Sequence, residues 1–243
     1  MIYIPKGLNL LVDVDSTPIL SVVVVEGALI FPPSDNPNHL RTFDAHYVMV
    51  RAGYFEAGTE QFPNTSKLII TMHSNRSSPE LPIFGNKVIA MYNGLLDIHG
   101  IPRNPTWTSL ETTANIGDTK ITLMREVDWK AGEKIVIAPT GYHNYEFDER
   151  TILSIDNSIP SKPVLTLDQP LTFKHYAAVE KFGNNGDEIE MRAEVGLLSR
   201  NIMYRGDPET SAAREYGAHI MIHSNGMETL TARIAYVHFF DCG

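Results

Sequence analysis

Five segments of the first hundred residues alternate apolar and polar positions with the two-residue period of a β-strand. They are rich in β-branched residues and are bounded by Gly, Pro, Asn and Ser. The segments cover residues 8–14, 21–31, 46–58, 67–74 and 87–100. This region shows no convincing 3.6-residue period of the kind an amphipathic helix has. The pattern therefore predicts an all-β fold.

Three of these segments place a glycine between two apolar runs, at Gly27, Gly53 and Gly94. Two of them close with a second glycine, Gly58 and Gly100. Glycine recurs at strand corners where the bend needs a positive φ, or where stacked coils leave no room for a Cβ atom. The repeat favours a solenoid of parallel strands, in which each coil covers the apolar row of the one before. An antiparallel sandwich of short strands is the alternative.

The middle of the chain has a different pattern. Residues 111–174 hold short strands separated by turn sequences such as "IGD", "KAGE" and "IDNS". We interpret them as a small antiparallel barrel or sheet inserted into the chain, after which solenoid-like strands return. The expected domains are 1–110 for the first β-helical coils, 111–180 for the insert and 181–243 for further coils. Both ends have strand patterns, which favours a fragment of a longer protein.

Composition narrows the function classes. The 243 residues carry a formal net charge of −9, and the sequence pI is about 5.4. An acidic chain without a basic stripe argues against nucleic acid or an anionic membrane as partner. No apolar run approaches the roughly 20 residues of a membrane span, and the start lacks the pattern of a signal peptide. The single cysteine, Cys242, cannot form an internal disulfide.

The first hundred residues resemble the G-eight domain family, named for its eight glycines. The resemblance rests on "IPKGLNLLVDVDSTPIL", "VEGALIF", "AGYFEAGTEQFP", "KLIITMH", "PELPIFGNKVIAMYNGLLDIHG" and "TWTSL". Seven glycines fit its pattern: Gly7, Gly27, Gly53, Gly58, Gly85, Gly94 and Gly100. The later segments "DWKAGEKIVIAPTG", "RAEVGLLSRNI" and "HIMIHS" are similar to those that follow this domain in fibrocystin-L-like proteins and in the cell-migration-inducing and cell-surface hyaluronidases.

The resemblance implies a right-handed parallel β-helix in a large extracellular or cell-surface protein. It also implies hyaluronan as a ligand to consider, because some relatives are hyaluronidases. The stretch between "YRGD" and "AHIMIH" is short and lacks the cysteines of the animal relatives, which indicates a divergent member.

Asp97 and His99 form an Asp-x-His pair in "LLDIHG". On a strand both side chains leave the same face, where they could act as a dyad or as two metal ligands. No nucleophile or third ligand follows at a recognisable spacing. We interpret them as outer-row residues of a coil whose inner row holds Leu96 and Ile98, and predict a ligand contact there.

His219 and His223 in "GAHIMIHS" have the spacing of a helical zinc pair but lack its Glu, and the residues between them suit a strand. On a strand they share a face about 13 Å apart, too far for one metal. We therefore expect solvent-side residues that could join a ligand-binding groove.

Asp13 and Asp15 share a face in "LVDVDSTP", and two carboxylates beside Ser16 could bind Ca²⁺. The spacing and glycine of an EF-hand are absent. A glycosidase would need two carboxylates across a sugar cleft, for which Glu56 and Asp97 are further candidates.

Other motifs are less specific. Asn64 in "NTS" and Asn75 in "NRS" are acceptor sequences for N-linked glycans. Arg205-Gly206-Asp207 is the integrin-type tripeptide, which also arises by chance. Trp107 and Trp129 are expected in the core, with sugar stacking as the role of an exposed one.

The favoured function is a non-catalytic extracellular module that supplies a stiff β-helical segment and a ligand-binding face. Its expected partners are the rest of the same β-helix and an extracellular glycan such as hyaluronan, or a cell-surface protein. The alternatives are part of a hyaluronan-degrading enzyme and a glycan- or calcium-binding adhesion domain. No cofactor is expected, with calcium as the one metal to consider.

Overall fold

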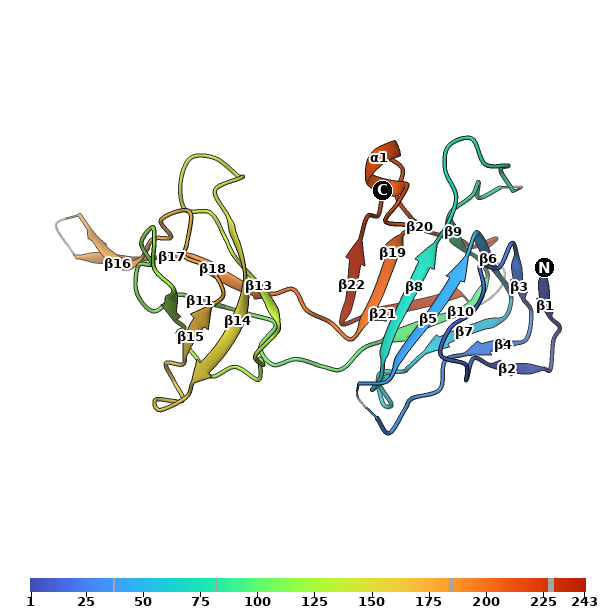
Figure 1. Cartoon of the computed structure of the whole chain (residues 1–243), viewed down its shortest axis with the longest axis horizontal. Coiled ribbons are helices and arrows are strands. Elements are labelled where there is room, and N and C mark those ends of the chain that lie inside the picture. Colours follow the sequence, from blue (N-terminus) through green and yellow to red (C-terminus); the bar gives the residue numbers. More distant parts are fainter. Residues whose placement is uncertain (37, 82, 184–185, 227–229) are drawn as a thin grey trace. The chain divides into compact units, whose positions relative to one another are not determined.

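The computed structural model describes residues 1–36, 38–81, 83–183, 186–226 and 230–243 (Figure 1). These residues form strands and loops with one short helix, α1 (Ser211–Arg214), which confirms the predicted all-β class. The helix is too short to cross a membrane, and the described residues contain no other candidate span. The chain divides into two compact units: unit 1 is Met1–Pro102 with Arg200–Gly243, and unit 2 is Arg103–Ser199.

Unit 1 consists of three sheets in which all neighbouring strands are parallel. The first sheet contains, in spatial order, β1 (Ile2–Ile4), β3 (Val23–Val25), β6 (Tyr47–Arg51), β9 (Val88–Tyr92) and β20 (His219–His223). The second contains β2 (Asn9–Leu11), β4 (Ala28–Ile30), β7 (Tyr54–Ala57), β10 (Gly94–His99) and β21 (Leu230–Ala235). The third contains β5 (Leu40–Ala45), β8 (Lys67–Met72), β19 (Ile202–Gly206) and β22 (Val237–Phe240).

The chain visits the three sheets in a constant order. Thus β3, β4 and β5 form one coil, β6, β7 and β8 the next, and β20, β21 and β22 the last. The coil that begins with β9 and β10 is completed by β19, so unit 2 is inserted in the chain between two sides of one coil. Asn201 joins the two ends of this insertion, because its Oδ1 accepts the N–H of Ile101 at 2.8 Å.

The three sheets enclose one apolar core. Its side chains come from alternate strand positions, as the two-residue period predicts, and include Val25, Val50, Phe55, Ile70 and Leu96. Burying each such side chain contributes roughly 1.5–3 kcal/mol. Because neighbouring strands of each sheet pair in register, the inner row of one coil packs against that of the next.

Glycines at the corner between the first and second sheets let the coils stack. A Cβ atom on Gly53 would lie 2.4 Å from the carbonyl oxygen of Val25 and 2.9 Å from that of Gly27. On Gly94 it would lie 2.4 Å from the carbonyl oxygen of Gly53. These distances are below any van der Waals contact. The corner therefore excludes a side chain, which is one of the two reasons for which the sequence pattern predicted glycine there.

Unit 2 is an antiparallel sheet of six strands. In spatial order they are β11 (Trp107–Ser109), β18 (Glu194–Leu197), β13 (Lys134–Ile137), β14 (Asp148–Asp156), β15 (Val164–Leu167) and β12 (Lys120–Thr122). The sheet curls, and its two edge strands meet at an antiparallel bridge between Leu110 and Leu123. It surrounds a second apolar core that includes Trp129.

A separate hairpin, β16 (Ala177–Phe182) with β17 (Asp187–Arg192), extends this unit. Residues 187–197, which we expected to return to the solenoid, pair within unit 2 instead. The reason lies in β18, which hydrogen-bonds to β11 and β13 and thereby helps the sheet to curl. The compact units change at residues 102 and 200, and the domain boundaries at 110 and 180 remain predictions.

Candidate functional site

The Asp97–His99 pair lies at the end of β10, with Leu96 and Ile98 pointing into the core. The two polar side chains therefore occupy the opposite row, yet they expose only 2 % and 7 % of their surface. Nδ1 of His99 lies 2.7 Å from Oδ1 of Asp97. Oδ2 of the same carboxylate lies 3.6 Å from Nη1 of Arg233. The pair is thus buried within unit 1, and neither Nδ1 of His99 nor Oδ1 of Asp97 has a hydrogen-bond partner among the described residues.

Asp97 belongs to a row of charged residues that crosses three coils. In the register of the second sheet it stands opposite Glu56 of β7 on one side and Arg233 of β21 on the other. The guanidinium of Arg233 offsets the repulsion between the two carboxylates, because opposite charges on neighbouring strands stabilise a sheet. Burial, followed by a hydrogen bond with Glu56, raises the pKa of Tyr54, which precedes Glu56 by two positions on β7.

An open groove of about 510 Å³ runs beside this row over the glycine corner. Its lining includes Gly27, Gly53 and Gly94, together with Tyr54, Arg233 and Glu26. The glycines that let the coils stack also leave space at this corner, because they have no side chains. The lining residues of the groove come from several coils and offer hydrogen-bond donors, acceptors and one aromatic ring.

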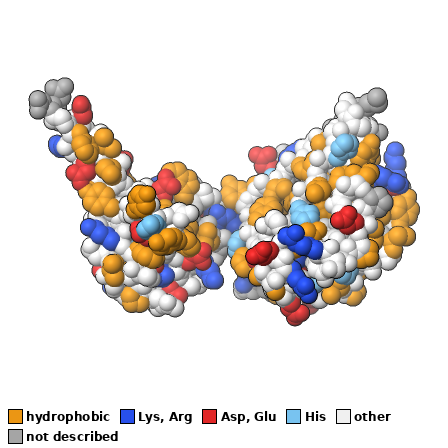
Figure 2. All heavy atoms as spheres, turned by 90° about the horizontal axis from the view of Figure 1, so that it is seen from above, with side chains coloured by type: hydrophobic (Ala, Val, Ile, Leu, Met, Phe, Trp, Pro, Cys, Tyr) orange, Lys and Arg blue, Asp and Glu red, His pale blue; other side chains and the backbone are white. Residues whose placement is uncertain are grey.

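Glu26 is held in place on one side of the groove. Tyr3 donates its hydroxyl to Oε2 of Glu26 at 2.5 Å, and Arg51 donates Nε–H to Oε1 at 2.7 Å. These hydrogen bonds, that of Tyr3 foremost, lower the pKa of Glu26. The carboxylate is therefore ionised and fixed at neutral pH. On the face of each unit that Figure 2 shows, acidic and basic side chains are scattered among apolar ones, and no basic stripe is visible.

The two predicted histidines lie on β20 in the first sheet, and so on a different sheet from Asp97 and His99. The ring of His223 stacks on Tyr92 at 5.3 Å between centroids, and it is exposed. His219 is half-buried, and burial lowers its pKa. The structure thus divides the four predicted ligand-binding residues between two sheets, and their ligand-binding role stays a prediction.

Asp13 and Asp15 are both exposed, in the loop after β2. Oδ1 of Asp15 lies 2.7 Å from Nε2 of His39. Within the ranges that the structure describes, no group of three or more His, Cys, Asp or Glu side chains is placed to hold a metal ion. Calcium binding at Asp13 and Asp15 stays a prediction.

The integrin-type tripeptide lies at the end of β19 and just beyond it. Arg205 donates Nε–H to the hydroxyl of Thr71 at 3.1 Å, and Gly206 is buried. A tripeptide that is built into a sheet in this way is poorly presented for recognition.

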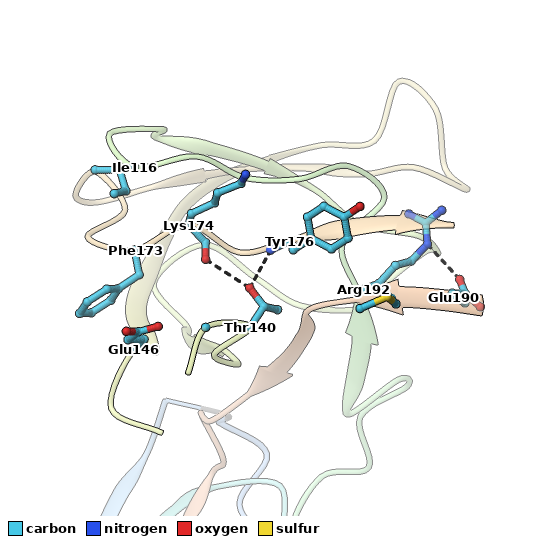
Figure 3. A pocket seen from close by; sticks show the side chains of 10 residues that line it. Ile116, Thr140, Glu146, Phe173, Lys174, Tyr176, Glu190 and Arg192 are labelled. Carbon is cyan, nitrogen blue, oxygen red and sulfur yellow. Dashed lines mark hydrogen bonds and ion pairs between the residues drawn. The ribbon is translucent and has the colours of Figure 1, made fainter. Parts of the chain in front are cut away.

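A pocket of about 850 Å³ in unit 2 was missed by the sequence reasoning (Figure 3). The hydroxyl of Thr140 donates to the carbonyl oxygen of Lys174 at 3.3 Å and accepts the N–H of Tyr176 at 2.9 Å. Nζ of Lys174 lies 6.0 Å from the centre of the Tyr176 ring. The lining comes from four separate segments of the chain, so no spacing in the sequence indicates it.

Asp148 binds the segment 172–176, part of which lines this pocket. Its carboxylate accepts backbone N–H bonds from Thr172 and Phe173 at 3.0 Å, and Nε2 of His175 lies 2.9 Å from it. Burial alone would raise the pKa of Asp148, but the hydrogen bonds from His175 and the backbone outweigh burial and lower it. His175 itself is fully buried, so this pair positions the segment and is not accessible to a ligand.

The two tryptophans differ in exposure. Trp129 is in the core and donates its indole N–H to the carbonyl oxygen of Pro105 at 2.8 Å. Trp107 is 51 % exposed and lines a second, apolar pocket of about 400 Å³ with Phe147 and Glu194. Trp107 is therefore the tryptophan to which the sugar-stacking prediction applies.

Comparison with known proteins shows what this chain is similar to. The G8 domain family matches residues 1–111, which confirms the predicted resemblance. Fibrocystin-L of Homo sapiens is 32 % identical over 277 residues, which cover 100 % of this chain and 6 % of fibrocystin-L. Fibrocystin-L of Mus musculus is 33 % identical over 276 residues, which cover 99 % of this chain and 6 % of that protein. A G8 domain-containing protein of Dictyostelium discoideum is 27 % identical over 237 residues, which cover 93 % of this chain and 16 % of that protein.

The chain therefore spans about 6 % of the length of the fibrocystin-L proteins that it matches. Their names state no ligand or reaction. The similarity therefore agrees with the predicted resemblance to fibrocystin-L-like proteins and indicates no substrate.

Proposed function

We propose that this chain is a non-catalytic extracellular module of a fibrocystin-L-like protein, and that unit 1 is a right-handed parallel β-helix with a glycan-binding groove. The constant order of the three sheets and the stacked glycine corner support the β-helix. Such a coil is stiff, because its backbone N–H and C=O groups pair with the coil on either side. The similarity to fibrocystin-L supports an extracellular or cell-surface location.

The observation that carries ligand binding is the groove over Gly27, Gly53 and Gly94, whose lining also holds Glu26, Tyr54 and Arg233. Neighbouring coils are about 4.8 Å apart, so equivalent groups recur at a short, regular spacing along the groove. A polysaccharide presents hydroxyl groups and apolar ring faces in a repeating order as well. Tyr54 offers a ring for stacking, and Arg233 offers donors to hydroxyl or carboxylate groups.

The same geometry disfavours catalysis at Asp97. A retaining or inverting glycosidase needs two carboxylates facing each other across the substrate, one of them protonated. Asp97 is buried, and both of its oxygens lie beside cationic or potentially cationic partners, His99 and Arg233. We infer that Asp97 organises the row, while the groove residues contact the ligand.

Calorimetry with size-defined hyaluronan and with a neutral oligosaccharide tests the proposal. We expect binding to the intact chain, and roughly tenfold weaker binding by Tyr54→Ala or Arg233→Ala, the equivalent of about 1.4 kcal/mol. Glu188→Gln, an exposed change on the hairpin of unit 2, is the matched control and should bind like the unchanged chain. Absence of binding, or equal binding by all variants, would refute the groove.

Size analysis of the recovered polymer separates binding from degradation. We expect hyaluronan of unchanged length after long incubation. Shortened product that disappears in Asp97→Asn would instead support the enzymatic alternative.

A further inference from the structure

Two asparagines of unit 1 begin an Asn-x-Ser sequence, the acceptor for an N-linked oligosaccharide in secreted chains. They are Asn64, followed by Thr65 and Ser66, and Asn75, followed by Arg76 and Ser77. The sequence treats them as equivalent, because both end in serine and both fall in loops. The structure distinguishes them by the surroundings of the side-chain amide.

The amide of Asn64 is enclosed. The residue exposes none of its surface, and its Oδ1 accepts both the N–H and the hydroxyl of Ser66, at 3.0 and 2.9 Å. Its backbone N–H donates to the carbonyl oxygen of His99 at 2.9 Å, and its own carbonyl oxygen accepts Nδ2–H of Asn201 at 2.7 Å. Nδ2, the atom that would be joined to a sugar, is buried. A glycan there is incompatible with this fold.

Asn75 is partly exposed and opens a tight turn. Ser78 closes the turn, since its N–H donates to the carbonyl oxygen of Asn75 at 3.0 Å. Oδ1 of Asn75 accepts the N–H of Ser77 at 2.8 Å. Because the amide oxygen makes this bond, Nδ2 is not needed to close the turn.

The turn also borders open space. Asn75, Arg76 and Ser77 line a pocket of about 450 Å³ whose other wall is α1 and Glu215. Nη2 of Arg76 donates to the carbonyl oxygen of Glu215 at 2.8 Å, which fixes the distance between the walls. The lining is mostly polar, so the first sugars of a glycan could lie against it without burying unpaired groups.

We propose that Asn75 carries an N-linked oligosaccharide and that Asn64 carries none. The proposal rests on the extracellular location proposed above. In the transfer, Nδ2 of Asn75 forms a bond to C1 of the first sugar, and the bond from C1 to a lipid diphosphate donor breaks. The diphosphate is released, and Nδ2 loses one proton. A bulky glycan at this turn also means that neighbouring domains leave the face beside α1 uncovered.

Secretion of the full chain from mammalian cells behind a cleavable signal tests the proposal, with intact mass measured before and after peptide N-glycosidase. We expect one occupied site, whose asparagine becomes aspartate on enzymatic release, at position 75. Asn75→Gln and Ser77→Ala should lose the glycan, and Ser77→Thr should keep it. Asn64→Gln should leave the glycan mass unchanged.

Secreted chain without any glycan, or with a glycan on Asn64, would overturn the proposal. Ser77→Thr keeps the result interpretable if the other variants fold poorly, because it conserves the hydroxyl and the acceptor sequence. A glycan on Asn75 in a chain that binds no hyaluronan would refute groove binding alone. Cytosolic retention of the natural parent protein would refute the extracellular location.

Discussion

Unit 1 and unit 2 solve the same problem, covering an apolar sheet face, in opposite ways. Unit 1 stacks parallel strands in three sheets and needs glycine where the coils bend. Unit 2 curls one antiparallel sheet, and most of its glycines have open space around them. The comparison teaches that glycine is a packing requirement in the first unit and mainly a turn requirement in the second.

The largest expected effect is that of Gly53→Ala. The new Cβ atom would meet two backbone oxygens, of Val25 and Gly27, neither of which can move without separating coils. We expect a loss of about 3–5 kcal/mol in the free energy of unfolding, or no folded protein. Urea titration followed by circular dichroism measures it.

Gly196→Ala in unit 2 is the matched control. Its Cβ atom would meet only a side-chain atom of Val136 at 3.5 Å, an ordinary contact. We expect a change below about 1 kcal/mol. Equal effects of the two substitutions would contradict the proposed difference between the units.

Next in size is Asp148→Asn, which leaves the buried ring of His175 and two backbone N–H groups without their anionic partner. We expect a loss of about 3 kcal/mol in unit 2. Both tryptophans lie in unit 2, so tryptophan fluorescence reports this unit selectively, while circular dichroism reports both.

Asp148 also predicts an acid limb for unit 2. The folded pKa lies below the ordinary value of 3.8, so the stabilisation is complete above that value and is lost as the pH falls through the folded pKa. The fluorescence midpoint in urea should therefore drop below about pH 4 in the unchanged chain. In Asp148→Asn this part of the pH dependence should be missing.

Lys87 gives unit 1 a pH dependence of the same sign, but at alkaline pH. Its ammonium is fully buried, and Nζ donates to the hydroxyl of Ser211 and the carbonyl oxygen of Tyr216, both at 2.8 Å. Burial lowers its pKa from the ordinary 10.5. The unfolded chain then holds the proton more tightly, so stability should rise as the pH increases through the folded pKa toward 10.5. In Lys87→Met, circular dichroism in urea should show this rise to be absent.

The smallest expected effect is that of Arg233→Ala on stability. The side chain is half exposed, and its contact with Asp97 is long, at 3.6 Å. We expect a loss of about 1 kcal/mol or less, because exposed ion pairs contribute little. A loss above about 3 kcal/mol would be as large as that expected for Gly53→Ala. It would show that the row of charges matters as much to the stability of unit 1 as the glycine corner.

Local patterns predicted much of the fold. The strand segments and the glycine corner follow from period and from backbone sterics, which act over a few residues. The same logic placed Asp97 and His99 in the row opposite Leu96. It did not predict their burial, because Glu56 and Arg233, which stand opposite Asp97 in the sheet, are 41 and 136 residues away in the sequence.

The same limit explains the residues that were missed. β18 has the pattern of a solenoid strand, and only its partners β11 and β13 assign it to unit 2. Lys87 looks like an ordinary surface lysine in "GNKVIAMY", and its burial depends on α1, which lies more than a hundred residues later. Asn64 and Asn75 have the same motif, and only the packing around their amides separates them.

The contact between Asn201 and Ile101 has a consequence for how such proteins diversify. The side-chain amide of Asn201 joins the point where the chain leaves the coil to the point where it returns. This contact does not depend on which residues lie between the two points. Ninety-odd residues could then be exchanged for a short connection, or for a different domain, while the stack beneath keeps its register.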